Sequence, residues 1–313
     1  MQKVIVGIGE LLWDVLPSGR RLGGAPANFT VMSSRLGNRG VIASRLGNDP
    51  LAAETREVLK AFPADISLLQ TDATHPTGTA GVEIRGGEPH FIIHEPAAWD
   101  FMEWTPEWRA LAQSADAVCF GSLAQRNPVS RTTIGEFLAA TRRECVRVFD
   151  VNLRPPFFSV HVVDASLASA TIFKLNEVEV PEVLAMLGMA RPGDKSEASL
   201  LAAARALLQK YPLNLVAITM GGEGSLLATR DAHHRHHGIP TAVADTVGAG
   251  DAFTAALVHA YVRGASLAEM NEAGNRWGGW VASQSGAMPP LDAATLAAIT
   301  QQIQSAGNHP ALS

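Results

Sequence analysis

Short runs of β-branched and other apolar residues recur along the chain and alternate with longer segments of helical spacing. The apolar runs are residues 4–8, 41–43, 117–120, 146–151, 172–175 and 215–219. The helical segments between them include residues 27–36, 51–61, 131–143 and 200–208. This alternation of strand and helix predicts an α/β fold with a doubly wound, mainly parallel sheet.

One region breaks the alternation. Residues 75–99 contain the string TGTAGVEI, a Gly86-Gly87 pair and the string HFIIHEPAAW, which is hairpin patterning without a helix. We expect a small β-sheet formed by about 11–22 and 75–100, which could act as a lid that excludes water from a reacting centre. An edge hairpin without a functional role explains the pattern equally well. The chain, 1–313, is otherwise expected to be a single domain.

The composition favours a globular protein with a small-molecule site. Hydrophobic residues make up 47% of the chain and charged residues 18%, which is enough to bury a full core. The formal net charge of −5 carries no broad basic excess of the kind that nucleic acid or an anionic membrane favours. A bound phosphate must therefore be held by local geometry.

The cysteines and the N-terminus favour a cytoplasmic location. Cys119 and Cys145 lie in separate apolar segments, which fits reduced core thiols rather than a disulfide framework. Glu10 and Asp14 interrupt the N-terminal apolar run, so it matches neither a signal peptide nor a membrane span. The histidine-rich tract 233–237 could in principle bind a metal, but a solvated turn explains it better.

The string DTVGAGDAF, from Asp245 to Phe253, carries the chemistry. Gly248 and Gly250 flank the small Ala249, so the backbone can turn sharply and present bare N–H groups. A helical pattern starts at about Asp251 and directs the positive end of its dipole into the same space. The segment is therefore predicted to bind an anion.

Asp251 would repel a bound phosphate unless it takes a proton. Phosphoryl transfer to an alcohol needs a base at the nucleophile and electrostatic stabilisation of the transferring group, both close together. The segment can supply both. A helix cap at Asp251 and a plain turn at the two glycines are the structural alternative.

The same string resembles the C-terminal signature of the ribokinase-like, or PfkB, family of carbohydrate kinases. The resemblance implies a ribokinase-like fold and an ATP-dependent sugar kinase. In it Asp251 is the catalytic base, and the amides of Gly248, Ala249 and Gly250 hold the transferring phosphate. Further matches run along nearly the whole chain in the family's order.

Two segments resemble the sugar-binding parts of the family. In GELLWDVLPSGRRLGGAPANFTVMSSRLG the resemblance places Asp14, Gly24 and Asn28 at the sugar hydroxyls, whose orientation a carboxylate and an amide can fix. DVNLRPPFF is similar to a DPNLR stretch in which Arg154 faces the substrate or the phosphates, with Val151 here in place of proline. A turn carboxylate, a helix-start amide and a surface arginine are the alternatives for Asp14, Asn28 and Arg154.

Other segments resemble the nucleotide and ion sites. KLNEVE looks like the N-x-x-E motif, with Asn176 on the nucleotide side and Glu179 organising hydrated Mg²⁺. The remaining residues that the resemblance places at the nucleotide are Thr219, Gly221 and Gly224 of TMGGEGSLL, and Asn275. It also implies a monovalent cation such as K⁺ between Asp245 and the loop 285–287. Helix-opening acidic residues and a glycine-rich hairpin are the structural alternatives.

Two familiar nucleotide motifs are missing from the sequence. No G-x-x-x-x-G-K-[ST] string occurs, which excludes a P-loop lysine. Gly7-Ile8-Gly9 is followed by Glu10 rather than by the remaining Rossmann spacing, which argues against a dinucleotide oxidoreductase.

Within the family, GGAPANF most resembles fructokinases, so D-fructose, phosphorylated at its 6-hydroxyl, is the expected substrate. Ketodeoxygluconate, ribose and nucleosides are the alternatives, because hydroxyl contacts discriminate among sugars through geometry that a sequence does not show. A non-catalytic sugar or nucleotide sensor and a structural α/β protein are alternatives of another class. Family members that pair their lids across a two-fold axis suggest a homodimer through the lid.

Overall fold

The computed structural model describes residues 2–16, 19–85 and 88–307. These residues form two compact units. The first unit contains Met1–Cys145 and Arg154–Phe158, and the second contains Val146–Leu153 and Ser159–Ser313. The chain therefore passes from one unit to the other three times.

The first unit is built on three parallel strands. Strand β1 (Val4–Ile8) lies between β4 (Arg39–Ala43) and β9 (Ala117–Phe120). Their side chains are almost all buried, as expected of strands in a covered parallel sheet. The α-helices of this unit are α1 (Ala25–Arg35), α2 (Pro50–Lys60), α3 (Pro106–Ser114) and α4 (Pro128–Ala140), and its 3₁₀ turns are η1 (Ala98–Phe101) and η2 (Leu123–Gln125).

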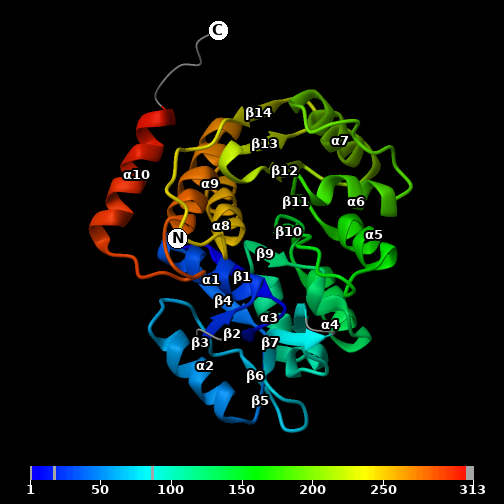
Figure 1. The fold of residues 1–313 in the computed structure, drawn as a ribbon, viewed down its shortest axis with the longest axis vertical. Helices are drawn as coiled ribbons and strands as arrows, with labels where there is room; N and C mark the ends of the chain where they lie inside the picture. The colour runs from blue at the N-terminus through cyan, green and yellow to red at the C-terminus, as the bar shows by residue number, and fades with distance from the viewer. Residues whose placement is uncertain (1, 17–18, 86–87, 308–313) are drawn as a thin grey trace. The chain divides into compact units, whose positions relative to one another are not determined.

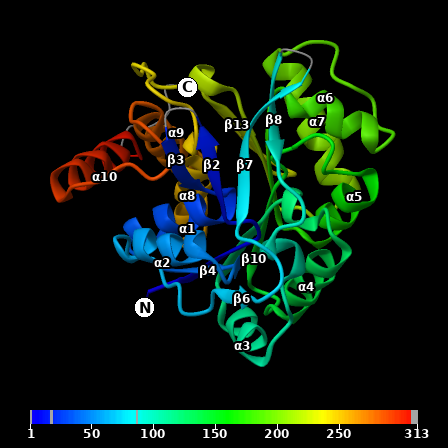
Figure 2. The same cartoon turned by 60° about the horizontal axis from the view of Figure 1, so that its bottom comes forward.

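A separate four-stranded sheet in the first unit has the order β3-β2-β7-β8 (Figure 2). Its strands are β2 (Leu12–Leu16), β3 (Gly19–Gly23), β7 (Gly78–Arg85) and β8 (Glu88–Ile93). Strands β2 and β7 pair in parallel. The outer strand β3 pairs antiparallel with β2, and the outer strand β8 pairs antiparallel with β7. The predicted small sheet is thus confirmed, and the predicted turn at Gly86-Gly87 lies outside the described residues. Strands β5 (Arg45–Gly47) and β6 (Gln70–Asp72) form a further short parallel pair.

The second unit contains the parallel strands β10 (Val146–Asp150), β11 (Ile172–Asn176) and β12 (Leu215–Thr219). Two antiparallel strands follow, β13 (Ser225–Ala228) and β14 (His233–His236), after the 3₁₀ turn η3 (Gly221–Glu223). Helices α8 and α9 lie side by side (Figure 1). The helices of this unit are α5 (Val160–Ser169), α6 (Glu179–Met186), α7 (Glu197–Lys210), α8 (Ala249–Tyr261), α9 (Leu267–Ala282) and α10 (Ala293–Gly307).

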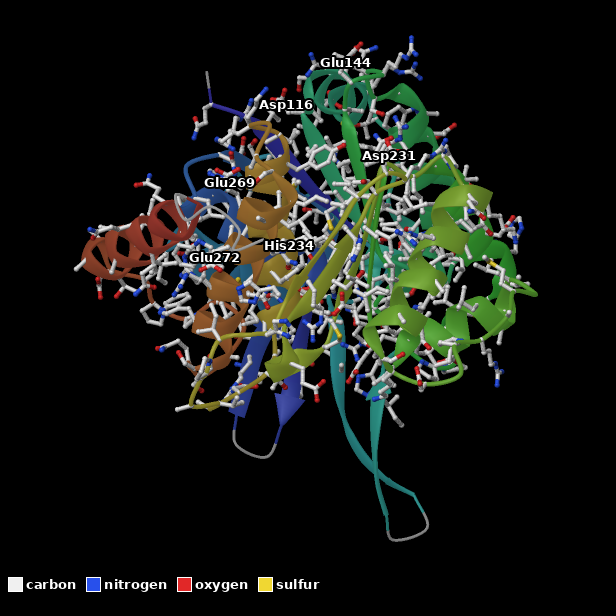
Figure 3. All side chains as sticks on the ribbon, turned by 90° about the horizontal axis from the view of Figure 1, so that it is seen from above. Asp116, Glu144, Asp231, His234, Glu269 and Glu272 are labelled. Atoms are coloured by element: carbon white, nitrogen blue, oxygen red, sulfur yellow. The ribbon has the colours of Figure 1, made fainter. Side chains whose placement is uncertain are left out.

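The predicted alternation of strands and helices is confirmed, and β9 and β12 have the predicted bounds. The histidine-rich tract was predicted wrongly as a turn, because four of its residues pair with β13 as strand β14. His236 Nε2 lies 2.8 Å from Glu272 Oε2 on α9. Figure 3 shows His234 and Glu272 beside each other where β14 meets α9. Pairing with β13 and packing against α9 therefore override the polar composition of the tract.

No helix within the described ranges is both long and apolar enough to cross a membrane.

Candidate active site

The glycine turn before α8 presents an uncapped helix end. Gly248 has φ 78°, a left-handed conformation, and a Cβ there would stand 2.6 Å from the Cα of Ala287. Helices α2, α5, α7 and α9 are capped by an Asp or Ser side chain, whereas α8 begins without a side-chain hydrogen bond at its cap. Its first amides and its positive dipole end therefore suit a phosphate oxygen.

Asp251 lies in the first turn of α8 and is partly exposed. A carboxylate at this point stands directly beside the amides that would hold an anion. The arrangement matches what a base for an attacking hydroxyl requires, because proton removal and phosphate stabilisation must occur within a few ångströms of each other.

A buried ion pair, which sequence reasoning missed, lies next to this turn. Lys174 on β11 and Asp150 at the end of β10 are 7% and 5% exposed, and Lys174 Nζ lies 3.1 Å from Asp150 Oδ1. Thr254 Oγ1 on α8 lies 3.0 Å from Asp150 Oδ2 and 2.9 Å from the Gly250 carbonyl oxygen. These contacts join two strands of the sheet to the first turn of α8.

Three carboxylates surround the Lys174 ammonium. Burial acts to lower the pKa of Lys174, but Asp150, Glu179 and Asp251 outweigh it and raise the pKa above its usual value. Lys174 is therefore a charged ammonium in a strongly acidic surrounding.

Glu179 is the first residue of α6 and is 8% exposed. Its Oε1 accepts a hydrogen bond from the Leu153 amide, and its Oε2 accepts one from the Asn176 amide, each at 2.8 Å. Burial raises its pKa, against the lowering effect of Lys174 and the two amides. A carboxylate held in this way fits a water ligand of Mg²⁺ better than the ion itself, because Mg²⁺ keeps much of its hydration shell.

Asn176 and Asn275 form contacts within the protein. Asn176 Oδ1 accepts hydrogen bonds from the amides of Val178 at 2.9 Å and Glu179 at 3.0 Å, so it caps the start of α6. Asn275 Nδ2 donates to Ser225 Oγ and to the carbonyl oxygen of Asn271, both at 2.7 Å. The Asn275 amide group is therefore committed to a network with β13 and not to the glycine turn.

The other predicted nucleotide residues surround the 3₁₀ turn that connects β12 to β13. Thr219 ends β12, and Gly221 and Gly224 have φ values of 53° and 89°. A Cβ at Gly224 would collide with the His236 carbonyl oxygen, so glycine is required there. The turn exposes Gly221 as bare backbone, which a nucleotide can approach closely.

Asp245 is brought against the loop 285–287. Its Oδ1 accepts from the Val247 amide at 3.0 Å, and its Oδ2 accepts from the Gly286 amide at 3.1 Å. No group of three or more histidine, cysteine or acidic residues that could hold a metal ion is present in the described part of the chain.

The predicted sugar residues gather in the first unit. Asp14, on β2, is half-buried; burial raises its pKa, and Arg154 and Arg21 partly offset the effect. Gly24 has φ 115° at the start of α1, where a Cβ would collide with the Glu10 carbonyl oxygen. Asn28 is 6% exposed in the first turns of α1, and Arg154 is exposed.

The structure thus forms two clusters, each within one unit. The first unit groups Asp14 with Arg154, close to the chain segment of Gly24 and Asn28. The second unit groups Asp251 and its glycine turn with Glu179 and the newly found Lys174. The sequence did carry a signal for the ion pair. Asp150 ends the string VRVFD at a buried position, and Lys174 lies at the centre of IFKLN. A charge in a buried strand needs a partner.

Comparisons with known proteins identify the family of the chain. The family model described as "pfkB family carbohydrate kinase" matches residues 18–294. A fructokinase of Escherichia coli is 30% identical over 266 residues, which cover 80% of this chain and 82% of the relative. A fructokinase of Salmonella typhimurium is 29% identical over 264 residues, covering 80% and 82%.

Solved structures extend the likeness to the whole fold. A crystal structure of an uncharacterized sugar kinase from Pyrococcus horikoshii has a TM-score of 0.81 and 25% identity, covering 97% of this chain and all of that one. A Vibrio cholerae fructokinase in fructose, ADP and calcium ion bound form has a TM-score of 0.77 and 26% identity, covering 96% and 99%.

The fold and the matches define a ribokinase-like sugar kinase, a phosphotransferase that uses ATP and a sugar hydroxyl as acceptor. The chain belongs to the pfkB family of carbohydrate kinases.

Proposed function

We propose that this kinase transfers the γ-phosphoryl group of ATP to a terminal hydroxyl of a monosaccharide, with D-fructose to fructose 6-phosphate as the first assignment. The observation that carries the proposal is Asp251 in the first turn of α8, beside an uncapped helix end that Gly248 opens. A carboxylate here serves as a base, and the adjoining amides serve the anion.

The roles in the reaction follow from this arrangement. Asp251 accepts the proton of the attacking hydroxyl, while the amides of Gly248, Ala249 and Gly250 hold the oxygens of the transferring group. The dipole of α8 adds positive potential at the same point. Glu179 would orient a water ligand of Mg²⁺, and the ion, when bound with ATP, would offset phosphate charge. The products are a sugar phosphate and ADP.

The sugar is assigned to the first-unit cluster. Asp14 and Asn28 orient hydroxyls through hydrogen bonds, Gly24 lets the backbone approach the sugar, and Arg154 supplies a positive charge near Asp14. Fructose is favoured by the string GGAPANF and by relatives that are named fructokinases at about 30% identity. Ketodeoxygluconate and ribose remain the competing substrates.

The nucleotide and ions are assigned to the second unit. The proposed nucleotide contacts are Asn176, Thr219, Gly221, Gly224 and Asn275. Since the Asn275 amide nitrogen already bonds Ser225 and Asn271, any contact from it to the nucleotide would use the remaining oxygen or an exchange of partners. Asp245 and the loop 285–287 are proposed to hold a monovalent cation, supported by the Asp245–Gly286 hydrogen bond.

The base is tested by Asp251→Asn, which keeps the size of the side chain and removes its basicity. We expect turnover to fall roughly 10²- to 10⁴-fold with an unchanged unfolding midpoint. ADP release with saturating ATP and fructose measures this, and Asp231→Asn on the surface is the matched control. Near-normal turnover in folded Asp251→Asn protein contradicts the assigned role.

The substrate is tested by ADP release against fructose, ketodeoxygluconate, ribose and nucleosides. Release with fructose at the highest kcat/KM supports the first assignment, and release with another sugar replaces it. Sugar binding without any release would identify a non-catalytic sensor on this fold, which is the second candidate function.

We further propose one kinase domain over 1–313 with the β3-β2-β7-β8 sheet as its lid, a homodimer through that lid, and a cytoplasmic location. The exposed Val15 on β2 supports the lid pairing, and the buried thiols of Cys119 and Cys145 support the location. Ile93, on β8, is 7% exposed and adds little apolar surface to such a contact.

A further inference from the structure

Lys174 lies among the carboxylates of Asp150, Glu179 and Asp251 in the second unit, and the proposed reaction gives it no role. Its ammonium lies 3.1 Å from Asp150 Oδ1 and is nine-tenths buried. Burying a lysine costs free energy unless its charge is paired, because an ammonium loses strong hydration when it leaves water. A purely apolar residue would suit the string IFKLN better as a core strand.

The ammonium also lies close against Gly250, the second glycine of the turn Gly248–Asp251. A left-handed conformation does not account for this glycine, since only Gly248 in this turn has a positive φ. A Cβ at Gly250 would stand 3.1 Å from Lys174 Nζ and 3.9 Å from its Cε. Because Gly250 has no side chain, the Lys174 ammonium can lie close to the backbone of the turn.

Asp150 connects the same ammonium to the start of α8. One carboxylate oxygen faces Lys174 Nζ, and the other lies 3.0 Å from Thr254 Oγ1, which also approaches the Gly250 carbonyl oxygen at 2.9 Å. Strands β10 and β11 thereby fix the register of the first turn of α8. A turn held in this way is preorganised, so it need not reorient as phosphate charge develops.

We propose that Lys174 is a positioning residue for phosphoryl transfer: with Asp150 and Thr254 it fixes the turn Gly248–Asp251 and places a positive charge beneath it. The inference rests on the proposed function of that turn. Because a preorganised positive charge acts on the redistribution of charge that occurs in the transition state, we expect Lys174 to affect kcat, and the binding of ATP much less.

The test compares Lys174→Met with the double variant Asp150→Asn/Lys174→Met. Methionine keeps the length of the side chain, and the double variant removes both members of the ion pair, so no new unpaired charge arises from Asp150. Lys60→Met, at an exposed lysine, is the control. For each protein we would measure kcat, KM for ATP and for fructose, and thermal unfolding.

We expect kcat to fall roughly 10- to 100-fold in both Lys174 variants, with KM for ATP changing less than about threefold. Return of the double variant to within about threefold of the wild-type kcat would show that the pair serves folding alone and overturns the proposal. A Lys174→Met protein that is folded and as active as Lys60→Met overturns it as well. Asp251→Asn in the same assay reports separately on the base: normal turnover there would overturn the proposed function, whereas normal kcat in the Lys174 variants alone would overturn only the role of Lys174.

Discussion

Among the described residues, a deeply buried ion pair occurs in each unit of this kinase, Arg126–Asp100 in the first and Lys174–Asp150 in the second, and the two pairs differ in their surroundings. In the first unit Arg126 and Asp100 have side chains that are 4% and 3% exposed, with two contacts of 2.7 Å between them. The Arg126 guanidinium lies 4.0 Å from the centre of the Trp99 ring and 4.8 Å from that of Phe157. A second carboxylate, the exposed Glu95, lies 3.8 Å from Arg126 Nε, but only Asp100 is buried with the arginine, next to the two aromatic rings.

In the second unit the balance of charge is unequal. Lys174 is influenced by Asp150, Glu179 and Asp251 together, and the cluster adjoins a glycine turn that any added side chain would disturb. The buried part of the Arg126–Asp100 pair is neutral, whereas the Lys174 cluster has more buried or half-buried carboxylates than cations, beside a proposed phosphate and Mg²⁺ site. A buried pair of equal and opposite charges needs no further partner, whereas an excess of carboxylates favours the approach of a cation.

Breaking the Arg126–Asp100 pair should have the largest effect on stability. Arg126→Met leaves the Asp100 carboxylate buried without its cation, and we expect a loss of about 3–5 kcal/mol in the free energy of unfolding. Urea unfolding measures the loss, with Arg143→Met on the surface as control. The kcat of the protein that remains folded should stay within about threefold of wild type, and a selective loss of kcat without loss of stability would erase the contrast between the two pairs.

Removing the acidic partner of Lys174, Asp150, should lower the free energy of unfolding by less. Asp150→Asn removes one carboxylate, but Glu179 and Asp251 still neutralise Lys174. We expect a loss of roughly 1.5–3 kcal/mol, which corresponds to one charge-assisted hydrogen bond. The same urea experiment gives the value. A cost equal to that of Arg126→Met would mean that Asp150 alone balances the lysine, as Asp100 does the arginine.

The smallest expected effect is a pH dependence of stability that arises from His259 in the second unit. Burial, together with Arg263, lowers the pKa of His259 on α8 from 6.5 to about 4. The unfolded chain then binds this proton more readily than the folded one, so stability is complete above about pH 6.5 and declines as the pH falls toward 4. His259→Gln should remove about 1 kcal/mol of the acid destabilisation at pH 5, after allowance for partial exposure.

Thermal or urea unfolding between pH 4 and 7 measures this slope, with His161→Gln on the surface as control. An identical slope for wild type and His259→Gln would show that other groups govern the acid sensitivity of the second unit.

Much of the fold could be predicted because its signals are local. Strands β9 and β12 appear in the sequence as continuous apolar runs, and their bounds were correct. The separate sheet could also be anticipated, since residues 75–99 alternate as a hairpin does. Strand β14 could not, because nothing within residues 233–237 indicates the pairing with β13 that makes them a strand.

The site divides in the same way. The turn at Gly248 and the acid at Asp251 lie within one short string, so their proximity is given by the sequence. Asp150 and Lys174 are separated by 24 positions and meet only because β10 and β11 pair in parallel, with Asp150 directly opposite Lys174. Asn275 was assigned to the nucleotide by resemblance, and its hydrogen bonds to Ser225 and Asn271 depend on the packing of α9 against β13, which only the structure supplies.

The path of the chain limits how such a kinase can be rearranged. Residues 154–158 belong to the first unit although they follow the first strand of the second, and they bring Phe157 against Arg126. When a ribosome has released only the first 145 residues, Phe157, which packs against Arg126, has therefore not yet been made. Neither half can be exchanged as an independent cassette by a single recombination, so the two should be inherited as one piece.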